Sequence, residues 1–132
     1  MDIFDMIKDM DINSGTTGKK FCEVETLLGV SFPDEYKQFM LNVNGIEGAI
    51  GQNAYIVIWP IEEIVDLNNE YGVNDVTPGL IYFGSDGGNS AYAFDIRKNN
   101  VVVEFPLDSI HIEDAKLIAD SFNKFIEKIY TD

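Results

Sequence analysis

Hydrophobic residues in the centre of the chain follow the two-residue period of β-strands. Residues 80–83 form a short apolar run, residues 91–96 alternate aromatic with small or polar side chains, and residues 101–105 are rich in valine. Such runs, bounded by glycine-rich or polar connections, predict three strands. The first connection, residues 84–89, contains three glycines, which can adopt positive φ in a tight turn. The second, residues 97–100, is polar, so the segment predicts a strand followed by a hairpin.

Helical spacing of apolar residues dominates the N-terminal part. Residues 1–10 predict a short amphipathic helix, and the polar, glycine-broken residues 11–18 predict a linker. A second helix is expected to follow, with Thr17 as its N-cap and Gly29 as its stop. Both helices have an apolar face that can pack against a core.

A third helix is expected to start at Pro33, because proline is tolerated in the first helical turn. Asp34 and Glu35 place negative charge at the positive end of the helix dipole, which explains this acidic pair without catalysis. Residues 44–45, Asn-Gly, predict the end of this helix, and residues 45–53 predict a loop.

The remaining pattern completes the chain. Residues 55–59 predict a strand, and Pro60 opens an amphipathic helix with a stop at Gly72. Residues 71–79 predict a loop, and residues 111–130 predict the longest helix, with apolar residues at helical spacing. The order of elements predicts an α+β fold, with a mainly antiparallel meander sheet flanked by helices. We expect one domain over residues 1–132, with the first helix and linker as an extension.

Composition indicates a protein of the cytoplasm. The chain has one cysteine, Cys22, so an internal disulfide is impossible and a reducing compartment is the simpler interpretation. No apolar run is long enough to span a bilayer, and the acidic N-terminal stretch argues against a signal peptide and against binding to a membrane surface.

Net charge is the strongest compositional signal. Nine Lys and Arg against 23 Asp and Glu give a formal net charge of −14, which argues against a nucleic-acid partner. No basic residue lies between Lys37 and Arg97, although many acids do. Solubility explains this simply; the alternative is an acidic surface that steers a cationic protein partner. The candidate partner-binding residues are the acids of the central region, Glu62, Glu63, Asp66, Glu70 and Asp86.

No motif in the sequence predicts a reaction. Gly84, Gly87 and Gly88 precede a strand, whereas phosphate-binding loops lead into a helix. One histidine, His111, and one cysteine show no metal-ligand spacing, and Cys22 is expected to be a packed, inert thiol. We therefore predict no catalytic residue, no metal, no cofactor and no enzymatic activity.

Two motifs together resemble the SUKH superfamily. The first is Phe-Pro-Asp-Glu-Tyr at residues 32–36, with Phe39 and the Asn-Gly pair that follow it. The second is Phe-Gly-Ser-Asp-Gly-Gly at residues 83–88, followed by Tyr-x-Phe-Asp at residues 92–95. The similarity runs from about Phe21 to the last helix, and this superfamily includes cell-wall-synthesis regulators and many bacterial immunity proteins.

The resemblance implies an α+β domain without catalytic residues. Bacterial members are implied to be cytosolic antidotes that bind a toxin domain, often a nuclease, and block it stoichiometrically. The motif residues are implied to be structural, and they are Pro33, Gly84, Asp86, Gly87, Gly88 and Asp95. The leading hypothesis is therefore an immunity protein for a basic toxin, and the alternative is a regulatory interaction module with no toxin partner.

Overall fold

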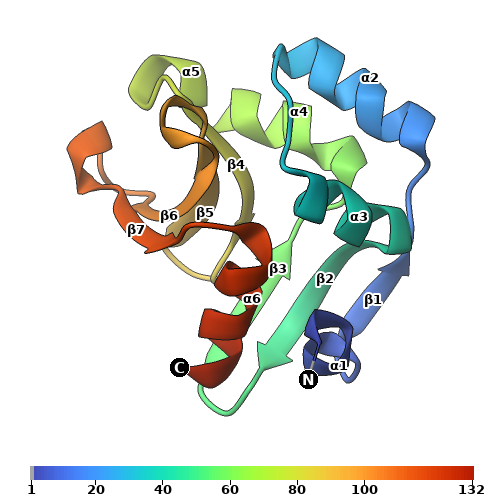
Figure 1. The fold of residues 1–132 in the computed structure, drawn as a ribbon. Helices are drawn as coiled ribbons and strands as arrows, with labels where there is room; N and C mark the ends of the chain where they lie inside the picture. The colour runs from blue at the N-terminus through green and yellow to red at the C-terminus, as the bar shows by residue number, and fades with distance from the viewer. Residues whose placement is uncertain (1) are drawn as a thin grey trace.

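One antiparallel sheet of seven strands runs through the molecule (Figure 1). The computed structural model describes residues 2–132. The strands lie in the sheet in the same order as in the chain, and each pairs antiparallel with the next, which confirms the predicted meander. The strands are β1 (Asp11–Ser14), β2 (Val43–Ile50), β3 (Ala54–Ile58), β4 (Leu80–Ser85), β5 (Ser90–Asp95), β6 (Val101–Pro106) and β7 (Lys116–Ala119).

Helices flank this sheet, as the α+β prediction requires. They are α1 (Ile3–Ile7), α2 (Gly18–Leu28), α3 (Asp34–Asn42), α4 (Ile61–Glu70), α5 (Val73–Val76) and α6 (Phe122–Thr131), with short 3-10 turns at Ile96–Lys98 and Ile112–Asp114. The predicted ends of α2 are confirmed. The hydroxyl of Thr17 accepts a hydrogen bond from the Lys20 N–H at 3.2 Å, and Gly29 ends the helix with φ of 68°.

The core lies between α3, α6 and one face of the sheet. Tyr36 of α3 is fully buried, with ring centroids 5.0 Å from Phe94 and 5.4 Å from Phe122. Phe83 of β4 stacks on Phe94 of β5 at 4.4 Å. Figure 1 shows α3 and α6 together against the curved sheet, while α2 and α4 pack side by side and α4 contacts the central strand β4.

An asparagine of α4 completes the hydrogen bonding of β4. Strands β3 and β4 pair only at Val57 with Ser85 and Ile58 with Gly84. Further along β4, the side chain of Asn68 accepts from the Tyr82 N–H and donates to the Tyr82 carbonyl, both at 2.9 Å. This buried amide therefore replaces a strand partner where α4 covers the sheet, and it satisfies backbone groups that would otherwise be unpaired.

The prediction of a linker over residues 11–18 is wrong for its first half. Residues Asp11–Ser14 form β1, which pairs with β2 at the edge of the sheet. The strand was missed because all four of its side chains are exposed, so it lacks an apolar face that could reveal its period. In the predicted helix over residues 1–10, α1 covers Ile3–Ile7, and residue 1 lies outside the described residues.

The prediction of a helix end at residues 44–45 is late by two residues, and the predicted loop over residues 45–53 is correct only for residues 51–53, which form a turn. Helix α3 ends at Asn42, and Val43–Ile50 forms β2. Gly45 has φ of 100°, and a Cβ there would lie 2.7 Å from the carbonyl oxygen of Ile58. Gly45 therefore permits a close approach between β2 and β3. In the sequence alone, the same glycine resembles the end of a helix.

The predicted helix over residues 111–130 is only half correct. Residues 116–119 form β7, which pairs with β6, and α6 begins after Ser121, whose hydroxyl accepts from the Lys124 N–H. Pairing with β7 satisfies backbone hydrogen-bonding groups of β6 that would stay unpaired if residues 116–119 were helical.

The predicted loop over residues 71–79 also differs, because it contains the single-turn α5. Among residues 2–132, no helix has the length and apolar character needed to cross a membrane.

Candidate partner-binding surface

Four of the predicted partner-binding acids lie on the exposed side of α4. Glu62, Glu63, Asp66 and Glu70 are all exposed, while Ile61, Ile64 and Asn68 of the same helix are buried. Positions 63, 66 and 70 are three and four residues apart, which places them along one side of the helix. The structure therefore brings these four acids together on one helix.

The N-terminus of α4 is held by a residue of β2. The side-chain oxygen of Asn44 accepts from the Ile61 N–H at 2.8 Å, and its amide donates to Glu62 at 2.8 and 3.1 Å. Pro60 provides no side-chain cap, so Asn44 supplies one from a distant strand. Glu62 is consequently fixed in place, whereas Glu63, Asp66 and Glu70 extend freely from the helix.

A groove of about 240 Å³ adjoins this helix on the outer side of β1, β2 and β3. Asp11 pairs with Glu47, and Glu47 pairs with Val57, so the sheet register places both carboxylates beside each other. Glu63 of α4 and Trp59 complete the groove. No lysine, arginine or histidine is among the described residues that line it.

The ionisation of Tyr55 reflects the negative potential beside this groove. Its hydroxyl donates to Glu47 at 2.9 Å, and its side chain is 43% exposed. The hydrogen bond to Glu47 is the main cause that raises the pKa of Tyr55, and the charges of Glu47 and Asp11 add to it. A negative charge on Tyr55 is disfavoured here because two carboxylates already lie close by.

We call Asp11, Glu47, Glu62, Glu63, Asp66 and Glu70 the acidic surface. None of its carboxylates forms a salt bridge in the part of the chain that the structure describes, where the ion pairs join Arg97 to Asp95 and Lys124 to Asp120. Asp11 and Glu47 were not predicted as site residues. No local signal in the sequence identifies them, because Asp11 and Glu47 come together only through the pairing of β1 with β2.

Asp86 does not belong to this surface. Its carboxylate accepts from the Gly88 N–H at 2.8 Å and from the Ser90 N–H at 3.2 Å within its own loop. Asp86 is not among the residues that line the groove, although its loop touches the Tyr55 ring, since a Cβ on Gly87 would be 2.7 Å from that ring. Asp86 instead lies near Tyr92, whose pKa is raised first by burial and then by Glu104, Asp86 and Asp132.

The remaining motif residues lie within the fold. Pro33 precedes the first turn of α3, and Gly88 is exposed in the loop after β4. Gly84 is buried against the carbonyl oxygen of Val57, so a side chain there would collide with β3. Asp95 is buried and binds Arg97 through two contacts of 3.0 Å.

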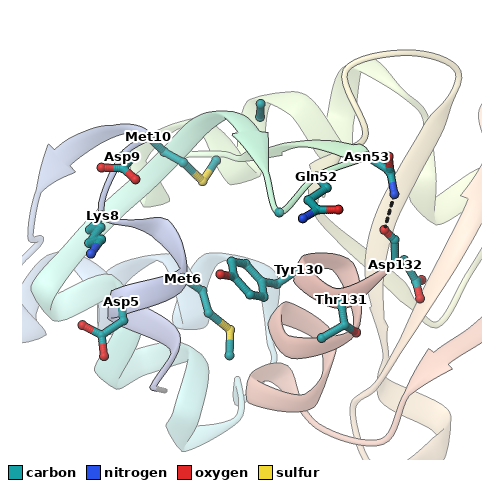
Figure 2. A pocket seen from close by; sticks show the side chains of 12 residues that line it. Asp5, Met6, Lys8, Asp9, Met10, Gln52, Asn53, Tyr130, Thr131 and Asp132 are labelled. Atoms are coloured by element: carbon teal, nitrogen blue, oxygen red, sulfur yellow. Dashed lines mark hydrogen bonds between the residues drawn. The ribbon is translucent and has the colours of Figure 1, made fainter.

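A separate hollow of about 800 Å³ opens between α1, the β2–β3 hairpin and the end of α6. Figure 2 shows Met6, Met10 and Tyr130 around it, and the Asn53 amide donating to the Asp132 carbonyl at 3.2 Å. Its charged residues have both signs, since Lys8 lies among aspartates. It contains none of the predicted site residues.

The lone cysteine and the lone histidine are not part of a metal-ligand cluster among the described residues. Residues 2–132 hold no group of three or more His, Cys, Asp or Glu that could bind a metal ion. Cys22 is exposed on α2 rather than packed, because the apolar face of this helix points away from it. His111 lies exposed just before a 3-10 turn.

The architecture is that of an α+β protein with a seven-stranded antiparallel meander. The model of the SMI1 / KNR4 family (SUKH-1) matches residues 15–128, so the chain belongs to this family, and the resemblance to the SUKH superfamily is confirmed. The chain is also similar to the uncharacterized protein YnaB of Bacillus subtilis (strain 168). The two are 33% identical over 116 residues, which cover 84% of this chain and 74% of YnaB.

Proposed function

We propose that this protein is a cytoplasmic immunity protein that binds and neutralises a cognate, cationic toxin domain of the nuclease kind. Its membership of the SMI1 / KNR4 family supports a protein–protein function. The proposal includes no catalysis, because neutralisation requires only that the toxin's functional surface be covered.

The observation that carries the proposal is the acidic surface. Three of its six carboxylates, Asp11, Glu47 and Glu63, line a groove that has no basic lining residue, and the other three lie exposed on the adjoining helix α4. The isolated protein offers them no counter-ion from its own described lysines and arginines. A cationic partner would supply that charge, and complementary potentials of this kind raise association rates by about 10- to 1,000-fold.

Co-expression with a toxin encoded beside the gene tests the proposal. We expect the wild-type protein to prevent killing and to co-elute with the toxin in size-exclusion chromatography. Glu63→Lys combined with Asp66→Lys should abolish both effects, because it reverses charge in the middle of the acidic surface. The matched control, Glu23→Lys with Asp108→Lys, changes net charge equally at exposed positions elsewhere and should still protect.

Continued killing with no complex would contradict the proposal. Capture of several unrelated proteins, with no toxin gene nearby, would instead favour a regulatory interaction module of the cell-wall-regulator type. These two results differ in both partner identity and cell survival, so the experiment separates the two functions.

A further inference from the structure

A second groove, distinct from the acidic surface, is lined by residues of α1, α3 and α6 and by Asp2, which caps α1. It has a volume of about 390 Å³. Phe4 and Phe39 form its apolar floor, with stacked rings whose centroids are 5.9 Å apart and whose planes differ by 11°. Phe4 is 39% exposed, so an aromatic face is open to solvent inside the groove.

The rim of this groove is acidic. Asp2 caps α1, Asp34 and Glu35 form the first turn of α3, and Glu127 lies on the exposed side of α6. No basic residue is among the described residues that line it. An apolar floor below a purely anionic rim complements a group that is both cationic and apolar.

Asn123 joins two of the helices that line this groove. The side-chain oxygen of Asn123, a lining residue, is buried and has no hydrogen-bond partner. The backbone N–H of the same residue donates to Glu35 at 3.1 Å, which joins α6 to α3. Asn123 thus fixes the junction of α3 and α6 beneath the rim, and its position among the lining residues makes it a reporter for anything that binds in the groove.

We propose that this groove receives an arginine side chain of a partner protein. A guanidinium group offers five N–H donors and no acceptor, which matches a rim made of carboxylates. Its planar face can stack on Phe4, the exposed ring of the stacked pair. The inference goes beyond the proposed function, because this groove shares no residue with the acidic surface, and it does not depend on the identity of the toxin.

A titration followed by NMR tests the groove without any toxin. N-acetyl-arginine amide should cause saturable shifts of the Asn123 side-chain amide and the Phe4 backbone amide, with a dissociation constant in the millimolar range. N-acetyl-citrulline amide has nearly the same shape but no charge, and it should cause no such shifts. N-acetyl-lysine amide should bind more weakly, because an ammonium group cannot stack as a plane.

Variants of the rim locate the binding. Asp34→Asn and Glu127→Gln should each weaken arginine binding by about two- to five-fold, while the exposed control Glu23→Gln on α2 leaves it unchanged. Both acids are exposed and form no hydrogen bond through their side chains, so the folded spectrum should be retained.

The absence of saturable shifts at Asn123 would overturn the inference, and so would equal binding of the citrulline compound. Equal weakening by the Glu23 control would also overturn it, because the effect would then reflect net charge alone. Since no toxin is present in the titration, these failures remain distinct from a failure of toxin neutralisation at the acidic surface.

Discussion

The hydroxyl group of Tyr36 lies inside the aromatic core without a hydrogen-bond partner. Burial raises the pKa of this phenol, so the group stays neutral. Tyr36→Phe removes only the unsatisfied hydroxyl, and we expect the free energy of unfolding to stay equal or to rise by up to about 1 kcal/mol. Urea denaturation measures this change.

The matched control at this position is Tyr36→Ala, which leaves a cavity among the surrounding rings. It should lower the free energy of unfolding by about 3–5 kcal/mol or prevent folding. A loss of more than about 1 kcal/mol in Tyr36→Phe would show that the hydroxyl has a partner after all.

The free energy of unfolding should depend on pH through the carboxyl group of Asp95. Burial tends to raise the pKa of its carboxyl, but hydrogen bonds and charge from Arg97 outweigh burial and lower it below the ordinary value of 3.8. The carboxylate therefore contributes stability above pH 3.8, and this contribution is lost as the pH falls through the lower folded pKa. Asp95→Asn should cost about 1–3 kcal/mol at neutral pH.

The difference between wild type and Asp95→Asn should shrink as the pH falls below 3.8, which denaturation at several pH values can follow. Asp120→Asn is the control, because its pair with Lys124 is exposed and 3.4 Å long, and it should cost less than about 0.5 kcal/mol. A constant difference at every pH would contradict the assignment of this stability to the Asp95 carboxylate.

Individual roles of this kind were only partly predictable. The sequence indicated Gly87 as a turn residue from its glycine-rich setting, and the structure shows it with φ of 81°. The cap that Asn44 gives α4 could not be predicted, because it joins residues 17 positions apart across two elements. Such contacts depend on strand register, which no local pattern in this sequence reveals.

At the scale of elements, the contact between α4 and β4 depends on the side chain of Asn68. Asn68→Ala should lower the free energy of unfolding by about 2–4 kcal/mol, because the N–H and carbonyl of Tyr82 would be buried without partners. Asn69→Ala is the matched control, since Asn69 is the exposed neighbour on the same helix, and it should change stability by less than about 0.5 kcal/mol. Thermal denaturation measures the stability of both variants. An equal loss of stability in Asn68→Ala and Asn69→Ala would contradict the role of Asn68 as the hydrogen-bond partner of Tyr82.

Elements with strong local signals were predicted well, and those that depend on pairing were not. Helix α2 was found with both caps because Thr17 and Gly29 act within the helix itself. The sequence predicts a helix where β7 forms, because Ala115, Ile118 and Ala119 fit a helical spacing that continues into α6. Its pairing with β6, a contact with a distant segment, determined the outcome.

At the scale of the whole molecule, the sequence predicted an acidic protein but not where its charge gathers. Four of the five predicted partner-binding acids share α4, because helical spacing places them together. Asp86 lies elsewhere, and the register of β1 with β2 adds Asp11 and Glu47. Net charge follows from composition alone. The grouping of acids into one surface depends on the fold, so the sequence predicts the acids that share a helix but not those joined by strand pairing.

The central claim is that the acidic surface binds a cationic toxin domain, and calorimetric titration of the purified pair tests it most directly. Affinity should fall as salt rises, and Glu63→Lys with Asp66→Lys should weaken binding by at least about 100-fold. Glu23→Lys with Asp108→Lys should stay within about threefold of wild type. Equal affinity of the two double variants, or wild-type binding that salt leaves unchanged, would contradict the claim.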